Sequence, residues 1–281
     1  MIKKEKKLGI IYILCAAFCF AMMNLFVKAS GDLPVFQKCF FRNFVAAFIA
    51  LAMVLKNKVP FHVGKGNWRY LATRCIGGTL GILCNFYAIG KLNIADASML
   101  NKLSPFFAIL MSIVVLKEKP NKVEWTAVAL AFIGALFVIK PSFNMDSVPA
   151  LLGVIGGFGA GLAYTCVRKM GQNGVNGSII VLCFSIFSCV SVIPGVILTY
   201  VPMEPLQLFY LMMAGVAAAG GQFSITAAYT KAPAKEISVY DYTQVIFAAL
   251  LSLIFFGDLP DGWSFVGYGI IIGTAVWKSL V

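Results

Sequence analysis

The stretch KLNIADASMLNKLSPFFAILMSIVVLKEKP, residues 91–120, occurs twice in outline along this chain. The second copy, residues 231–260, reads KAPAKEISVYDYTQVIFAALLSLIFFGDLP, so the two copies are offset by 140 residues. Each copy opens with a polar connector and continues as an apolar run with polar residues in its first half. Each closes with an acidic residue two positions before a proline. Repetition at a fixed offset points to an architecture built from two related units.

The composition identifies lipid as the solvent for most of the chain. Of the 281 residues, 60% are hydrophobic and only 12% are charged. A soluble domain carries about 25% charged residues, roughly twice this share. The chain is therefore expected to be an all-α polytopic membrane protein.

Runs of about twenty apolar residues are long enough to cross a bilayer as helices. The first run, which follows the basic N-terminal residues, is too long for a cleaved signal peptide and is expected to remain as a membrane helix. The sequence predicts ten such helices, at roughly 9–28, 34–55, 69–90, 95–116, 122–140, 149–168, 177–200, 206–230, 236–256 and 262–280.

The net charge of +12 does not indicate nucleic-acid binding, because the basic residues lie in the connectors between apolar runs. Sixteen Lys and Arg residues fall on the side of the predicted N-terminus, and three (Lys28, Lys91 and Lys140) fall on the other side. Such a bias predicts that the side rich in Lys and Arg is cytoplasmic. We therefore expect both termini in the cytoplasm and the protein in the inner or plasma membrane.

The repeat divides the chain into residues 7–140 and 141–281, each with five predicted helices. Because five is an odd number, the two halves cross the membrane in opposite senses. Inverted repeats of this kind build alternating-access transporters, with the substrate site near the middle of the membrane. The expected motion is a rocking of the two halves around that site.

The ends of the two halves, LKEKPNKVEWTAVALAFIGALFVI and FFGDLPDGWSFVGYGIIIGTAVW, resemble the EamA domain of the drug/metabolite transporter superfamily. The run NFYAIGKLNIADASML is similar to the end of the third helix and the start of the fourth in that family. The resemblance implies ten helices, cytoplasmic termini and transport of small metabolites, often export. The small multidrug-resistance branch of the superfamily carries an acidic residue in its first helix, whereas residues 9–28 and 149–168 contain none.

Ionisable groups inside predicted spans are candidates for function because they are costly in lipid. Arg42, Lys38 and Lys102 could form a basic patch in the outer half of a cavity, although both lysines could also extend to the headgroups. Arg74 and Asp241 are expected in the inner half, either as a structural pair or as a substrate contact with its counter-charge. Asp241 is also the candidate for proton coupling.

Helical spacing adds uncharged polar groups to these candidates. Asn85 shares a face of the third helix with Arg74, and Asn101 lies at the start of the fourth helix. The ninth helix repeats that position with Asp241 and adds Gln244 one turn later.

Two tyrosines and a proline complete the set of candidates. Tyr164 lies in the sixth helix, and Tyr240 precedes Asp241. Pro105 weakens the backbone hydrogen bonding of the fourth helix and is a candidate hinge. The predicted substrate-binding residues are Arg42, Arg74, Asn85, Asn101, Lys102, Tyr164, Tyr240, Asp241 and Gln244.

These features predict a secondary-active transporter, most simply an exporter, of a small anionic or zwitterionic metabolite such as an organic acid or amino acid. The alternatives are an exporter of organic cations and drugs with the same fold, and a membrane receptor or scaffold that transports nothing. An enzyme is not predicted, because the single His62 lies in a basic connector and no catalytic cluster is present.

No cofactor or metal is predicted either, because the eight cysteines form no CxxC pair and no Walker motif occurs. The expected partners are the small-molecule substrate and the bilayer. A coupling proton or counter-substrate, and a monomer or homodimer, both remain open.

Overall fold

The computed structural model describes residues 2–117, 119–139, 147–231 and 238–280. The first half forms α1 (Ile2–Ala29), α2 (Val35–Lys56), α3 (Trp68–Lys91), α4 (Ile94–Asn101), α5 (Ser104–Val115) and α6 (Lys122–Ile139). The second half forms α7 (Val148–Gln172), α8 (Gly177–Thr199), α9 (Pro205–Lys231), the 3₁₀ helix η2 (Ser238–Tyr242), α11 (Thr243–Phe256) and α12 (Gly262–Leu280). Each of the ten predicted helices is present in the part of the chain that the structure describes. The predicted boundary between the halves, at residues 140 and 141, lies outside it.

The helices have the length and composition of membrane spans. Within the described residues, six segments of 18 residues or more are apolar enough to cross a bilayer. They are Lys7–Ala29, Val35–Lys56, Ile94–Val115, Val148–Gln172, Gly177–Thr199 and Pro205–Tyr229. Together with the shorter apolar segment Tyr240–Phe256 and the helices α3, α6 and α12, the described helical segments number the ten expected.

The fourth helix of the first half is interrupted and that of the second half opens with a 3₁₀ helix, whereas the sequence predicted one continuous helix in each. Helix α4 ends at Asn101, and α5 begins at Ser104 with Pro105 in its first turn. Proline has no N–H to donate and is favoured at a helix start, so it sets the position of the break. In the second half, the 3₁₀ turn η2 precedes α11 at the equivalent position.

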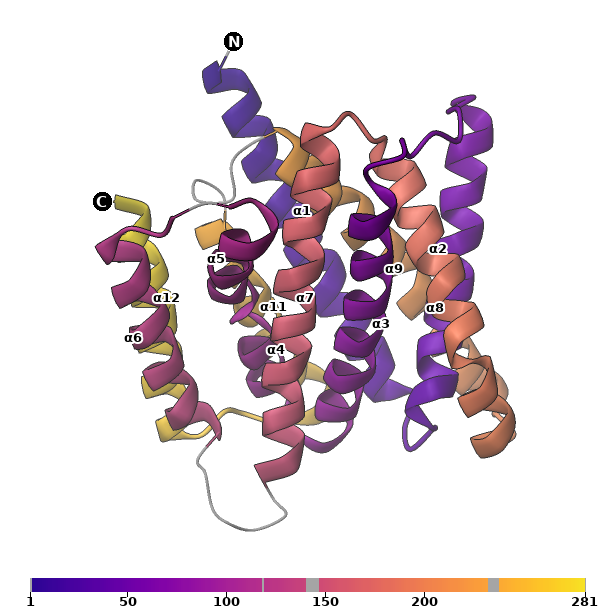
Figure 1. The fold of residues 1–281 in the computed structure, drawn as a ribbon. Coiled ribbons are helices and arrows are strands. Elements are labelled where there is room, and N and C mark those ends of the chain that lie inside the picture. The colour runs from indigo at the N-terminus through magenta and orange to yellow at the C-terminus, as the bar shows by residue number, and fades with distance from the viewer. Residues whose placement is uncertain (1, 118, 140–146, 232–237, 281) are drawn as a thin grey trace.

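Helices of the two halves interleave in the bundle. The most extensive helix contacts pair α1 with α9 and α3 with α7, which in both cases are helices from different halves. The pair α6 and α12 forms one side of the bundle, and the pair α2 and α8 forms the other (Figure 1). The two sequence halves are therefore not separate bodies, and a rocking motion would involve groups of helices drawn from both.

Small residues allow the backbones of α3 and α7 to approach closely. A Cβ atom at Gly159 would lie 2.6 Å from the carbonyl oxygen of Gly77, and one at Gly156 would lie 3.1 Å from that of Gly81. Glycine at such spacing is typical of tightly packed membrane helices. This contact fixes the helix that carries Arg74 against the second half.

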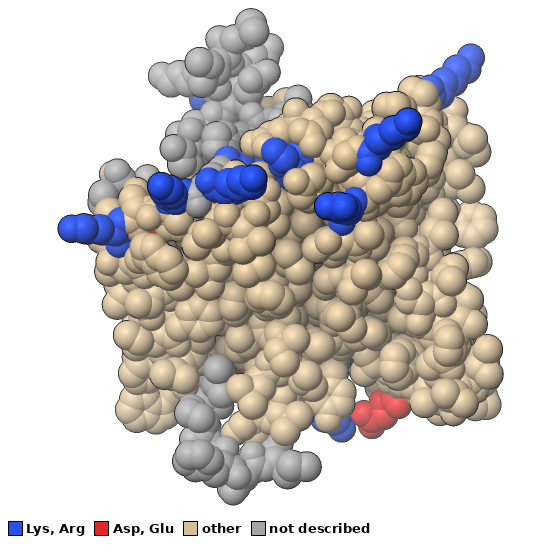
Figure 2. All heavy atoms as spheres, viewed as in Figure 1, with Lys and Arg blue, Asp and Glu red and all other residues tan. Residues whose placement is uncertain are grey.

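Basic side chains gather at one end of the bundle (Figure 2). We call this the basic end; α1 begins there, and its exposed residues include Lys56, Lys58, Lys65, Arg69 and Lys122. The opposite end, where α1 ends and α2 begins, shows few charged side chains in this view. Lys140 and Lys235, and the side chains of Lys3, Lys4, Lys6 and Lys231, which also entered the charge count, lie outside the described part.

Candidate functional site

A narrow cavity lies in the interior of the bundle between helices of both halves. It has about 60 Å³ of room for the centres of water-sized molecules, enough for a few waters. Seven of the nine predicted residues line it: Arg42, Arg74, Asn85, Asn101, Lys102, Tyr164 and Gln244.

Two arginines project into this cavity from α2 and α3. Arg42 and Arg74 are 1% and 3% exposed, so both guanidinium groups are buried. The Cζ atoms of Arg74 and Arg42 lie 3.9 Å and 5.9 Å from the centre of the same Phe184 ring on α8. Aromatic faces attract cations, and more strongly where water is excluded. Phe184 is therefore a common platform for both arginines.

Neutral amides complete the surroundings of the arginines. Arg74 donates to the Oε1 atom of Gln222 on α9 at 3.0 Å, and Arg42 donates to the Oδ1 atom of its neighbour Asn43. The Nε atoms of both arginines have no hydrogen-bond partner among the described residues. Each guanidinium therefore retains donors that are available to a ligand.

Gly78 provides the space for the Arg74 guanidinium, which folds back along α3. A Cβ atom at this position would overlap the guanidinium and would lie 2.8 Å from the ring of Phe184. A larger residue at Gly78 would displace Arg74 from the aromatic platform.

An ion pair joins the break between α4 and α5 to η2 of the second half. Nζ of Lys102, the residue that follows α4, lies 2.6 Å from Oδ2 of Asp241 in η2. The two side chains are 2% and 0% exposed. The predicted pair of Arg74 with Asp241 was wrong: the break after α4 turns Lys102 inward, and this lysine takes the carboxylate.

Two further predictions are not met by the geometry. Tyr240, which was predicted from its place beside Asp241 at the start of the ninth helix, lies in the 3₁₀ helix η2, is 38% exposed and is not among the cavity residues. Lys38 is buried but directs its Nζ to the carbonyl oxygen of Gly31 at 2.6 Å, toward the opposite end of the bundle. The predicted patch of Lys38, Arg42 and Lys102 is therefore not formed.

Several cavity residues were not anticipated, among them Asn24, Gln222 and Phe184. The 140-residue offset would have found Asn24 from the predicted Tyr164. Asn24 corresponds to Tyr164, and Ile82 corresponds to Gln222, and all four line the cavity. The pairs Phe20 with Ala160 and Met23 with Ala163 follow the same rule.

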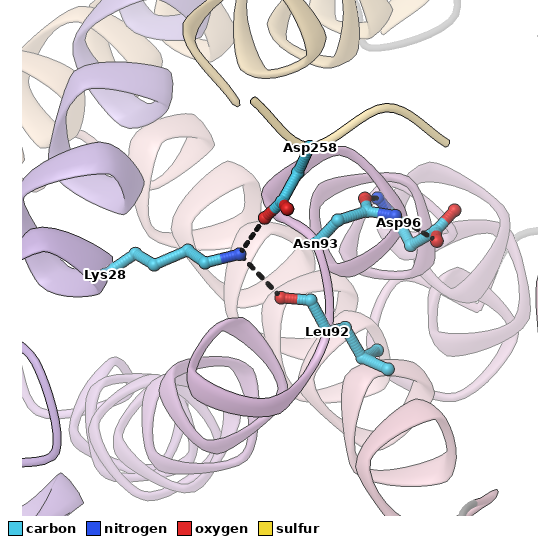
Figure 3. Close-up of polar contacts among 5 residues, drawn as sticks. All are labelled: Lys28, Leu92, Asn93, Asp96 and Asp258. Atoms are coloured by element: carbon cyan, nitrogen blue, oxygen red, sulfur yellow. Dashed lines mark hydrogen bonds and ion pairs between the residues drawn. The ribbon is translucent and has the colours of Figure 1, made fainter. Parts of the chain in front are cut away.

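A second polar cluster joins the two halves at the opposite end of the bundle (Figure 3). Nζ of Lys28, at the end of α1, lies 2.9 Å from Oδ2 of Asp258 and donates to the carbonyl oxygen of Leu92 at 3.2 Å. Asp96 accepts from Asn93 at 2.6 Å and also from the hydroxyl of Tyr268 on α12 at 2.6 Å. Through Lys28–Asp258 and Tyr268–Asp96, the cluster holds α1 and α4 of the first half to the second half.

Comparison with protein families and curated relatives places the chain among transporters. The model of the EamA-like transporter family matches residues 7–140 and again residues 148–279. The chain is 30% identical to the pseudopaline exporter CntI of Pseudomonas aeruginosa, over 96% of this chain and 94% of the relative. It is 26% identical to human solute carrier family 35 member G1, over 97% of this chain and 79% of the relative.

A solved structure shares the fold. One crystal structure superimposes with a TM-score of 0.73 over 97% of both chains, although only 17% of the residues are identical. The arrangement of ten membrane helices is therefore shared by proteins whose sequences differ widely.

Proposed function

The chain belongs to the EamA-like transporter family of the drug/metabolite transporter superfamily, and on this basis we propose that it exports a small anionic or zwitterionic metabolite by secondary-active, alternating-access transport. Membership of this family makes the chain a transporter and not an enzyme. The observation that carries the choice of substrate is the buried pair of arginines on the cavity wall. The Pseudomonas relative is named an exporter, which supports the outward direction of transport.

The electrostatics of the cavity favour an anion. Two guanidinium groups are buried there, and neither forms an ion pair with a carboxylate among the described residues. A buried charge without a partner costs several kcal/mol. A negatively charged ligand removes this cost, whereas an organic cation would increase it.

Polar contacts at the opposite end support an alternating mechanism. Besides the cluster around Lys28, the side chain of Gln37 on α2 exchanges hydrogen bonds of 2.8 Å and 3.2 Å with the backbone of Val201. Gln207 on α9 donates to the carbonyl oxygen of Ser30 at 3.2 Å. Because a cavity of this size cannot hold a metabolite, we expect these contacts to separate when the site opens toward this end.

The proposal is tested by efflux from proteoliposomes that contain the purified full-length protein. The vesicles are loaded with labelled glutarate, glutamate, lysine or the organic cation tetraphenylphosphonium, and each is assayed with wild type, Arg42→Gln and Lys91→Gln. We expect efflux of glutarate or glutamate that falls at least tenfold in Arg42→Gln. Lys91, which is exposed at the opposite end, serves as the matched control and should leave the rate unchanged.

Other outcomes would select the alternatives. Efflux of tetraphenylphosphonium alone, undiminished in Arg42→Gln, would contradict the charge argument and favour a drug exporter. Failure of all four probes to move, with folded protein in the vesicles, would contradict the proposed substrate class.

We also propose Asp241 as the group that couples transport to protons. Its carboxylate is fully buried, and Lys102, Tyr164, Tyr229 and Tyr242 are the titratable groups near it. Asp241→Asn should abolish the dependence of efflux on an imposed pH gradient. A variant that keeps the full dependence would remove Asp241 from this role.

The proposed orientation places the basic end in the cytoplasm of the cell that makes the protein, with the chain in its inner or plasma membrane. Basic residues concentrate on the cytoplasmic side of membrane proteins, and Figure 2 shows them at one end of this bundle. A reporter that works only in the cytoplasm should be active when it is fused to either terminus. A reporter that works only on the outer side should be inactive at both termini. Activity of a reporter that requires the outer side would reverse the orientation.

A further inference from the structure

We infer that the transported substrate carries two negative charges, one for each arginine of the cavity. This inference rests on the proposed function and narrows its substrate class to dianions. The starting point is the charge balance of the cavity wall, on which Arg42, Arg74 and Lys102 are the charged residues within the described chain.

Lys102 contributes no free charge to this balance. Its ammonium group lies 2.6 Å from the carboxylate of Asp241, and both side chains are almost completely buried. The pair is neutral as a unit. The two arginines, by contrast, have neutral hydrogen-bond and aromatic partners among the described residues: Gln222, Asn43 and Phe184. Within the described chain, the uncompensated charge of the cavity wall is therefore two positive units.

The geometry limits the length of such a substrate. Because both Cζ atoms lie near one ring centre, at 3.9 Å and 5.9 Å, they cannot be farther apart than the sum of these distances, 9.8 Å. Two acid groups joined by a few carbon atoms span this range. The free Nε donors of both arginines are suited to carboxylate or phosphate oxygens, which guanidinium binds with two parallel hydrogen bonds.

The same charge balance disfavours a simple zwitterion. The ammonium group of an amino acid is bound best by a free carboxylate, and among the described residues the carboxylate beside the cavity, that of Asp241, is paired with Lys102. Binding of the amino acid would then have to separate Asp241 from Lys102, which leaves the buried Lys102 without a partner. A dianion leaves this pair intact and neutralises both arginines.

The experiment compares dianions with ligands of the same shape that carry one charge. Succinate, glutarate and adipate are each titrated against their monoamides by calorimetry, with the purified full-length protein at neutral pH. We expect at least one diacid to bind wild type tenfold or more tightly than its monoamide. Arg42→Gln and Arg74→Gln should each reduce this ratio to about one, while Arg74→Lys, which keeps the charge, should retain most of it.

Lys91→Gln is the control and should leave the ratio unchanged. A melting curve of each variant shows whether the protein is folded. If a glutamine variant is not folded, Arg74→Lys still tests the inference, because it keeps the positive charge. Equal affinity of wild type for diacid and monoamide would overturn the inference but leave the proposed function standing. Binding of an amino acid such as glutamine, with none of the diacids bound, would overturn the inference but leave the proposed function standing. Binding of tetraphenylphosphonium alone would overturn both.

Discussion

Two lysine–aspartate pairs connect the halves of this transporter, and they differ mainly in their surroundings. Lys102–Asp241 lies in the interior, with side chains 2% and 0% exposed, whereas Lys28–Asp258 lies at the opposite end, with side chains 19% and 45% exposed. Their Nζ–Oδ2 distances, 2.6 Å and 2.9 Å, are similar. In each pair the first half supplies the lysine and the second half the aspartate.

The comparison shows that the same ion pair has different uses at different depths. In the interior, removal of one partner leaves a charge that water cannot reach, so loss of either partner is costly. At the partly exposed end, water solvates either partner after separation, and an exposed pair contributes only about 0–1 kcal/mol. The outer pair can therefore open and close during transport at little cost.

The largest effect is expected when the interior pair is broken. Lys102→Met leaves Asp241 buried without a partner and should lower the free energy of unfolding by about 3–5 kcal/mol. Lys102→Met combined with Asp241→Leu should recover most of the loss, because neither charge remains. Unfolding in mixed detergent micelles measures both. Equal losses in the single and double variants would show that packing, and not charge, holds this position.

An intermediate effect is expected at the hydrogen bond beside the outer pair. Tyr268 donates to the buried carboxylate of Asp96 at 2.6 Å. Hydrogen bonds to charged groups contribute about 1.5–3 kcal/mol, so Tyr268→Phe should destabilise the protein by this amount. The same unfolding assay measures it. A change below about 0.5 kcal/mol would mean that Asn93 alone satisfies the carboxylate.

The smallest effect on stability is expected at the outer pair itself, where the change should appear in conformation. Lys28→Ala should cost less than about 1 kcal/mol. The assay uses a cysteine placed at Asn24 in a cysteine-free background and an impermeant thiol reagent added at the opposite end of the bundle. Lys28→Ala should increase the rate at which this cysteine is labelled. The charge reversal Lys28→Asp with Asp258→Lys should restore slow labelling, and Lys91→Ala is the control. Unchanged labelling in Lys28→Ala would mean that this pair does not help to close the cavity.

Hydropathy and the repeat predicted the ten helices, and depth along α2 predicted that Arg42 would lie in the interior. These properties depend on one helix at a time. The partner of Asp241 was missed because it depends on a break after α4 that rotates Lys102 inward. Tyr240 was misplaced because a 3₁₀ turn changes which residues share a face. Gln222 was missed because an uncharged residue in an apolar helix gives a weak signal, and its counterpart in the repeat is the apolar Ile82.

The interleaved packing has a consequence for the order in which the protein is made. The main packing partner of α1 is α9, which begins 176 residues after α1 ends. At about 5–20 residues per second, this partner is synthesised roughly 9–35 s later. Until then α1 must wait in the membrane with Asn24 in place, a polar group that lipid does not satisfy. Assembly of the cavity is therefore a late event of biogenesis, after nearly the whole chain has been inserted.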